Sequence, residues 1–152
     1  MFRLLDRPYY TDKEITIVLK GVYAREDDVG IKRTYRYDIK LYGEDVTVGY
    51  VDLRVGDSEY LFYMGHIGYR IEEEYRGHHY AEKAVRLVLN QARKEKMETV
   101  IITCSPENIA SYKTITNLKA KLLGTYNVPE WHELYKYGEL SKCVFELKIK
   151  EK

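Results

Sequence analysis

A glycine and two adjacent histidines stand directly before the longest helical pattern of the chain, in the stretch RGHHYA at residues 76–81. A strand-like segment precedes this stretch. The first N–H groups of a helix have no partner inside it and carry the positive end of its dipole, so this arrangement is typical of an anion-binding loop, with a phosphate as the natural ligand. The residues match neither GxxxxGK[ST] nor GxGxxG, which excludes the two common phosphate-loop motifs.

The histidines of this region could hold a metal or move a proton. His78 and His79 are adjacent, project in different directions and have no Cys or carboxylate at ligand spacing, so we expect no metal there. His66 lies on the predicted strand before the loop, where an imidazole that titrates near neutrality could take a proton, directly or through water. A purely structural histidine is the alternative.

The first half of the chain predicts β structure. Its segments are rich in β-branched and aromatic residues and are separated by turn sequences, which favours an antiparallel meander. The expected strands are residues 14–24, 34–42, 45–55 and 61–71.

Helical periodicity begins after residue 75. Residues 79–96 predict a helix, because apolar residues recur on one face. Those residues are Ala81, Ala84, Val85, Val88 and Ala92.

The remaining elements follow from short patterns. Residues 99–104 form a continuous apolar run, which predicts a strand covered on both faces. Ser105 and Pro106 are expected to be the N-cap and first residue of a second helix that ends before Gly124. Residues 143–149 predict the last strand. The fold class is therefore α/β (α+β).

Length and composition favour one domain over residues 1–152. The 25 basic and 24 acidic residues nearly cancel, so we expect no nucleic-acid or membrane binding by bulk charge. No signal peptide or apolar run of roughly 20 residues is present, and we expect a cytoplasmic protein. Cys104 and Cys143 lie in apolar runs and are expected to be buried, reduced thiols.

The segments GYRIEEEYRGHHYAEKAVRLVL and VIITCSPENIASYKTITNLKAKLLG together resemble the coenzyme-binding core of the GNAT (Gcn-five-related N-acetyltransferase) superfamily. The branch they resemble contains ribosomal-protein N-acetyltransferases. The resemblance covers residues 65–124. Arg76, Gly77 and Ala81 stand in the family's places, whereas His79 occupies the position of a usual second glycine. We expect His79 to keep helical backbone angles and to turn its ring outward.

The resemblance implies a GNAT-like mixed, mostly antiparallel sheet with flanking helices and two parallel central strands that splay apart. Acetyl-CoA would lie in the slot as co-substrate, with its pantetheine arm along the fourth strand and its pyrophosphate on the loop amides. The residues implied in coenzyme binding are Gly68, Tyr69, Arg70, Ile71, Arg76, Gly77, His78, His79, Tyr80, Ala81, Asn108 and Ser111.

The same resemblance implies direct attack of an amine on the thioester, with a backbone N–H near residues 67–69 stabilising the oxyanion. His66 is the candidate base. Many members protonate the leaving thiolate with a tyrosine, but Ile115 stands at that position, and Tyr112 is a weak substitute. The aromatic stretch at residues 131–137 either lines the acceptor pocket or only anchors a loop.

One departure concerns the acceptor side. The family usually has two helices between its first two strands, whereas residues 25–33 are long enough only for a turn. The resemblance implies an acetyl-CoA-dependent N-acetyltransferase for a primary amine of a small molecule or peptide. A non-catalytic acyl-CoA-binding or regulatory module is the alternative, and a homodimer remains open.

Overall fold

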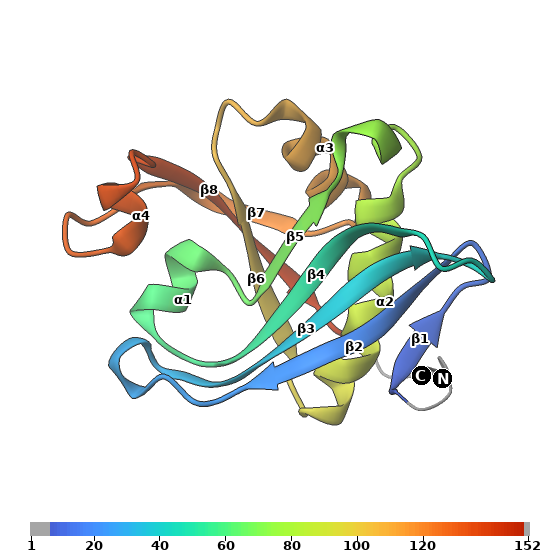
Figure 1. Ribbon diagram of the computed structural model, residues 1–152. Coiled ribbons are helices and arrows are strands. Elements are labelled where there is room, and N and C mark those ends of the chain that lie inside the picture. Colours follow the sequence, from blue (N-terminus) through green and yellow to red (C-terminus); the bar gives the residue numbers. More distant parts are fainter. Residues whose placement is uncertain (1–6, 151–152) are drawn as a thin grey trace.

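The computed structural model describes residues 7–150 and contains two antiparallel sheets (Figure 1). The larger sheet has the strand order β1-β2-β3-β4-β5, and the smaller has the order β6-β8-β7. The strands are β1 (Tyr9–Thr11), β2 (Ile15–Tyr23), β3 (Ile31–Leu41), β4 (Thr47–Gly56), β5 (Ile67–Ile71), β6 (Thr99–Cys104), β7 (Lys121–Asn127) and β8 (Ser141–Lys148). The helices are α1 (Glu59–Met64), α2 (Tyr80–Lys94), α3 (Ile109–Asn117) and α4 (Glu133–Lys136), with short 3₁₀ turns at Asp27–Val29 and Glu73–Tyr75. Within residues 7–150, none of the helices combines the length and hydrophobicity that crossing a membrane requires.

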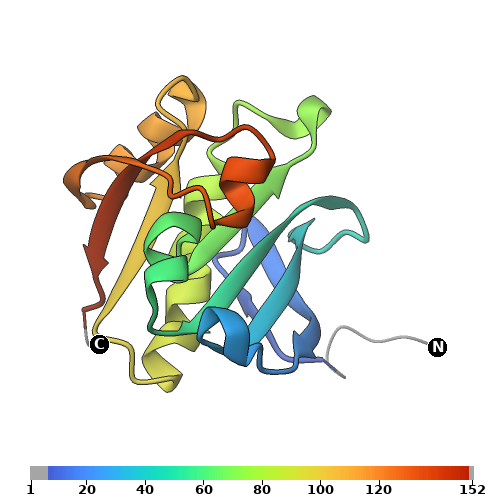
Figure 2. The same cartoon turned by 90° about the vertical axis from the view of Figure 1, so that its left-hand side faces the viewer.

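Helix α2 packs behind the larger sheet and joins the two sheets through one core (Figures 1 and 2). Its predicted apolar face is confirmed, because Ala84, Val85, Val88 and Ala92 are fully buried. The core continues across both sheets, with Ile39 of β3 and Ile102 of β6 also at 0% exposure. A shared core of this kind fixes the angle at which the sheets diverge.

Strands β5 and β6 run in the same direction and separate from each other, as Figure 1 shows. They are held together at one end, where the N–H of His66 donates to the carbonyl of Ile101 at 2.7 Å and the N–H of Ile101 donates to Nδ1 of His66 at 2.8 Å. Beyond this point the strands belong to different sheets. The predicted pair of splayed parallel strands is thus present.

The predicted strand over residues 61–71 is wrong in its first part, which forms α1. Ser58 caps this helix by accepting the N–H of Leu61, and Gly65 ends it at φ +85°. Tyr60, Phe62 and Tyr63 made the segment resemble a strand, but the two cap residues decide its local structure.

The second helix also begins and ends elsewhere than expected. Asn108, not Ser105, is its N-cap, and the helix stops at Asn117. The residues expected to continue it toward Gly124 form β7, which pairs with β8. Strand β6 is confirmed at its predicted bounds, although its residues alternate between buried and half-buried. Cys104 and Cys143 are buried, free thiols, as predicted.

The His66 ring is expected to stabilise the junction of β5 and β6 in its neutral form. Its Nδ1 accepts from Ile101 and its Nε2 donates to the carbonyl of Gly56 at 3.0 Å. Burial lowers the pKa of His66, so the unfolded chain binds its proton more readily as the pH falls below about 6.5, and the stabilisation is lost on acidification. His66→Gln should lower the unfolding free energy at pH 7.5 by about 1–3 kcal/mol and weaken this acid dependence, measured by urea unfolding from pH 7.5 to 5.5.

The exposed His78 supplies the control, because His78→Gln should change neither quantity. An unchanged stability of His66→Gln at pH 7.5 would show that the two ring hydrogen bonds do not hold the strands.

Candidate active site

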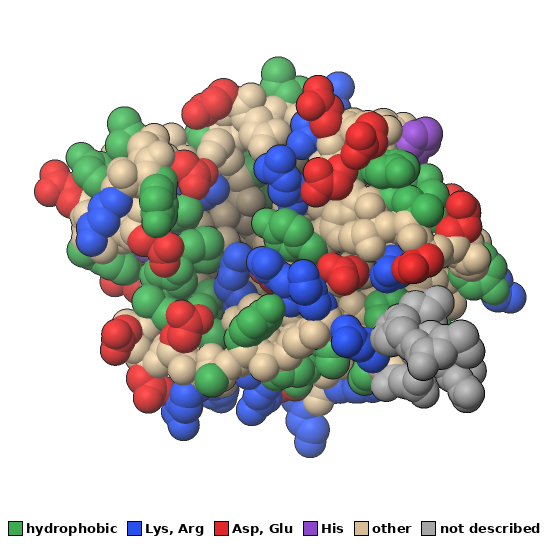
Figure 3. All heavy atoms as spheres, viewed as in Figure 1, with side chains coloured by type: hydrophobic (Ala, Val, Ile, Leu, Met, Phe, Trp, Pro, Cys, Tyr) green, Lys and Arg blue, Asp and Glu red, His purple; other side chains and the backbone are tan. Residues whose placement is uncertain are grey.

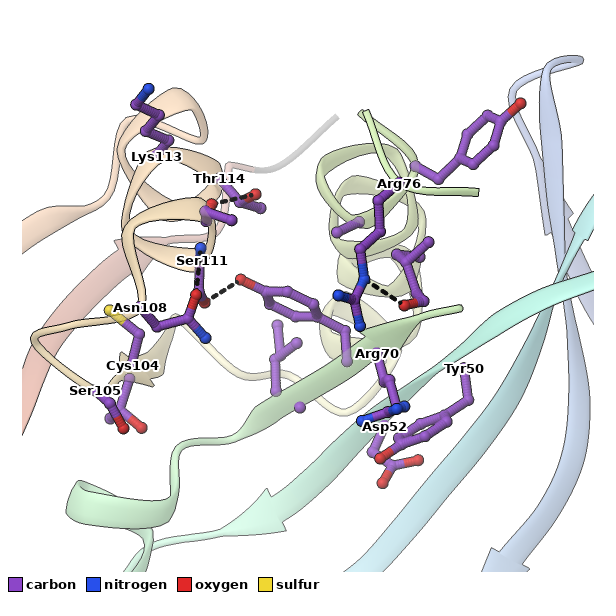
Figure 4. Close-up of a pocket in the computed structure, with 18 of the residues that line it drawn as sticks. Tyr50, Asp52, Arg70, Arg76, Cys104, Ser105, Asn108, Ser111, Lys113 and Thr114 are labelled. Carbon is purple, nitrogen blue, oxygen red and sulfur yellow. Dashed lines mark hydrogen bonds between the residues drawn. The ribbon is translucent and has the colours of Figure 1, made fainter. Parts of the chain in front are cut away.

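A cleft of about 770 Å³ lies where β5 and β6 diverge. Figure 3 shows a hollow on this side of the molecule with Lys and Arg side chains gathered along its edge. In Figure 4, side chains of α3 line one wall and those of β4, β5 and the loop before α2 line the other. Two ends can be distinguished by their side chains: a loop end near α2 and α3, and a strand end over β3, β4 and β5.

The loop end presents backbone N–H groups without acceptors. In the part of the chain that the structure describes, no backbone or side-chain group accepts the N–H of any residue from 77 to 82. The amide of Arg76 is different, since it donates to the carbonyl of Glu73 at 3.3 Å. The guanidinium of Arg76 donates to the carbonyl of Ile71 at 3.0 Å, which fastens the loop to the end of β5. The free amides therefore belong to residues 77–82.

The backbone of this loop is turned by two residues with positive φ. Gly77 has φ +91° and His79 has φ +63°. The expectation of helical angles for His79 is wrong: it is the N-cap of α2 in the left-handed conformation that a glycine would adopt without cost. Its ring does point outward, with 70% of the side chain exposed, as expected.

The side chains of the loop divide between the cleft and the surface. Arg76, Gly77, His79, Tyr80 and Ala81 line the cleft. His78 does not, because its ring stacks on that of Tyr80 at a centroid distance of 5.2 Å. The His78 side chain thus lies outside the cleft, whereas its N–H, the group expected to contact the coenzyme, remains among the free amides.

Strand β5 lies at the edge of the larger sheet, and its backbone groups alternate between β4 and the cleft. The N–H of Arg54 donates to the carbonyl of His66, and the N–H of Glu72 to that of Val48. By antiparallel alternation the backbone groups of Gly68 and Arg70 therefore also face β4. The backbone groups of residues 67, 69 and 71 face the cleft instead. Of the four strand residues expected to bind the coenzyme, only Tyr69 and Ile71 therefore offer their backbone groups to the cleft.

The hydroxyl of Tyr69 reaches across the cleft to α3. It forms a 2.7 Å hydrogen bond with the hydroxyl of Ser111, shown as a dashed line in Figure 4. Burial raises the pKa of Tyr69, so its phenol stays protonated at neutral pH. Asn108 lies beside this bridge, and its side-chain oxygen accepts the N–H of Ser111 as the helix cap. The Nδ2 group of Asn108 remains available to a ligand.

The two candidate acid–base residues do not lie at the cleft. Both ring nitrogens of His66 are occupied by backbone groups, so it has no free lone pair to act as a base. Tyr112 is 36% exposed and packs edge-on against Phe145, outside the cleft. Ile115 is fully buried in the core. Cys104 lines the cleft, but burial raises its pKa to about 11, which keeps the thiol protonated.

The strand end contains a charged group that the sequence reasoning missed. Arg36 holds Asp52 with two hydrogen bonds of 2.7 Å, and its guanidinium lies 4.3 Å from the centre of the Tyr50 ring. Arg54 and Arg70 complete the group. A signal was present in the sequence YVDLRV, where Tyr50, Asp52 and Arg54 alternate with apolar residues and must share the face opposite the core.

The residues described by the structure contain no group of three or more His, Cys, Asp or Glu side chains arranged to hold a metal ion.

Comparison with known proteins agrees with this geometry. Residues 7–121 match the family model of the acetyltransferase (GNAT) domain. YnaD of Bacillus subtilis (strain 168), named an uncharacterized N-acetyltransferase, is 24% identical over 147 residues, which cover 88% of this chain and 85% of that protein.

Two solved structures share the fold. The ribosomal-protein-S5-alanine acetyltransferase of Vibrio fischeri matches with a TM-score of 0.60 and 17% identity, over 78% of this chain and 63% of that one. The microcin C7 self-immunity acetyltransferase MccE, solved with acetyl-CoA and AMP, matches with a TM-score of 0.57 and 16% identity, over 76% and 61%. This chain thus spans less than two thirds of either solved chain. Because the family model covers most of the sequence, the chain belongs to the GNAT family of acetyltransferases.

Proposed function

We propose that the protein transfers the acetyl group of acetyl-CoA to a primary amine in this cleft. The observation that carries the proposal is the row of N–H groups at residues 77–82, which have no acceptor in the described chain. Four of these residues, Gly77, His79, Tyr80 and Ala81, line the cleft between the diverging strands. Converging amides at a helix N-terminus bind phosphate well. MccE, which was solved with acetyl-CoA, shares the fold, and this likeness supports the pyrophosphate of the coenzyme as the phosphate bound here.

The rest of the cleft fits an extended acyl-CoA chain. The free edge of β5 offers the N–H and C=O groups of residue 69 to the amides of a pantetheine arm, as an added strand would use them. Asn108 faces the same space with its unused Nδ2 group (Figure 4). The thioester then lies where β5 and β6 meet, beside the N–H groups of residues 67 and 69.

The reaction follows from this placement. A neutral amine attacks the thioester carbon, and a backbone N–H of β5 stabilises the oxyanion that forms. When the C–S bond breaks, the amide product leaves and the sulfur takes a proton from the Tyr69 hydroxyl, which regains it from water. The surplus proton of the amine passes to water in the open cleft. Orientation of the two substrates supplies much of the rate enhancement.

Gly77→Asp should abolish coenzyme binding. A Cβ at this position would meet no atom within 4 Å, so the carboxylate would sit beside the proposed pyrophosphate and repel it without a steric clash. Acetyl-CoA at saturating concentration should raise the melting temperature of the wild type by several degrees and that of Gly77→Asp by none.

Gly77→Asn is the matched control, because asparagine carries the same backbone strain at φ +91° without the charge. It should retain most of the thermal shift. Equal shifts in wild type and Gly77→Asp would remove the loop from the coenzyme site, whereas stabilisation without thiol release from any amine would favour the non-catalytic module.

Tyr69→Phe should lower kcat by about tenfold or more and leave the KM for acetyl-CoA within about twofold, because it removes the proton donor and keeps the ring. Thiol release under saturating acetyl-CoA measures both constants. Tyr112→Phe removes a hydroxyl outside the cleft and should leave both unchanged. If Tyr69→Phe keeps the wild-type kcat, the thiolate departs without an acid from this strand.

A further inference from the structure

Among residues 7–150, no helix covers the face of β3, β4 and β5 that points away from α2. In Figure 1 this face of β3 and β4 is turned toward the viewer, and the segment between β2 and β3 contains only the 3₁₀ turn Asp27–Val29. The side chains on this face therefore meet an acceptor directly, with no helix in between. Those at the cleft are Arg36, Tyr50, Asp52, Arg54 and Arg70.

One carboxylate of this face is already neutralised. Asp52 is 4% exposed and both of its oxygens accept from Arg36, while the Tyr50 ring covers the same guanidinium. A bidentate pair of this kind is rigid and leaves little net charge. It acts as a fixed wall of the site.

Arg54 has no such partner. Its guanidinium is half-buried and donates one hydrogen bond, to the carbonyl of Gly65 at 3.0 Å, and no carboxylate of the described residues lies within 4.0 Å of it. A guanidinium has five N–H donors, and a half-buried charge is costly without a counter-charge. Most of the binding capacity of Arg54 is therefore available to a ligand.

Arg54 also lies next to the proposed thioester. Its Nη2 would be 2.9 Å from a Cβ at Gly68, so the absence of a side chain at Gly68 is what leaves room for it across β5. Arg70 follows two residues later on the same face, has no carboxylate partner among residues 7–150, and extends toward Tyr50 and Asp52 in Figure 4. Two unpaired guanidinium groups thus flank the backbone position at which the amine must arrive.

The charge around Arg54 indicates on which side an anion would bind. Arg54 also lines a second cavity of about 490 Å³, whose wall contains Glu26 and Glu133 and would repel an anion. At the strand end of the cleft the nearest carboxylate is the paired Asp52. Glu139, the other carboxylate of the cleft, is held by Lys142 at 2.7 Å.

We propose that the acceptor carries an anionic group, a carboxylate or a phosphate, close to its reactive amine, and that Arg54 binds this group with help from Arg70. The proposal rests on the proposed acetyl transfer and adds the substrate class. The same positive charge favours the neutral, nucleophilic form of the amine over its ammonium form. An acceptor with a second ammonium group beside the amine is disfavoured.

Matched acceptor pairs test the proposal. Thiol release is measured with phenylalanine against phenethylamine, and with O-phosphoethanolamine against ethanolamine. The anionic member of at least one pair should have a kcat/KM at least about tenfold higher, since charge-assisted hydrogen bonds to a guanidinium discriminate strongly. The pair that shows the preference identifies the anion as a carboxylate or a phosphate.

Arg54→Gln should raise the KM for the preferred anionic acceptor about 10- to 100-fold and leave the neutral member within about twofold. Arg54→Lys, which keeps the charge but loses the planar fork, should fall in between. Arg70→Gln should have a smaller effect because Arg70 is exposed. Arg25→Gln removes an exposed arginine that lines neither cavity and should change nothing.

Equal rates within both pairs, or a preference that survives Arg54→Gln, would overturn the proposal. If no compound is acetylated, calorimetric titration of the enzyme–CoA complex with the same four compounds tests the proposal. Binding of an anionic compound without its neutral counterpart, and loss of that binding in Arg54→Gln, would support the proposal. Any other pattern would contradict it. Failure of acetyl-CoA itself to bind would instead refute the proposed function.

Discussion

The cleft depends on a pair of hydrogen bonds between the His66 residue and the backbone of Ile101. They join β5 to β6 at one end, where the imidazole Nδ1, instead of a backbone carbonyl, accepts the N–H of Ile101. Beyond it, α2 and the shared core hold the two sheets apart. An edge of β5 is therefore left unpaired inside the molecule, which is a state that most sheets avoid. That edge opens into the cleft.

The loop before α2 shows the same separation of structural and binding groups. The Arg76 side chain fastens the loop to Ile71, while the backbone turns at Gly77 and His79 with positive φ and the amides of residues 77–82 have no acceptor in the described chain. A non-glycine residue in the left-handed region costs on the order of 1 kcal/mol. His79 thus adopts, as the N-cap of α2, the left-handed conformation that is usual for glycine.

The parts of this architecture that repeat locally were predictable from the sequence. Hydrophobic patterns predicted the apolar face of α2, strand β6 and the meander of β2, β3 and β4. The loop before α2 was predicted from its glycine and from its place before a helix. The wrong predictions concern the residue that caps α3 and the role of His66. Ser105 was expected to cap α3, but its hydroxyl donates to Glu139, and Asn108, three residues later, is the cap. The sequence suggested His66 as a base, but in the structure both of its ring nitrogens form hydrogen bonds with the backbone of Gly56 and Ile101, which lie 10 and 35 positions away in the sequence. Contacts at that separation leave no periodic signal in a sequence.

Within the described residues no helix covers the outer face of β3 and β4, and this affects how selectivity can arise. In a closed acceptor pocket, shape excludes unsuitable substrates, whereas an open sheet face offers only the side chains that alternate on its strands. Here those side chains are a rigid Arg36–Asp52 pair and two guanidinium groups without carboxylate partners in the described chain. If the proposed acetyl transfer takes place here, such a surface restricts the charge of an acceptor beside its amine far more than the size of the remainder. A peptide and a small molecule could both satisfy it, since the part of the acceptor beyond Arg54 extends over an uncovered strand surface.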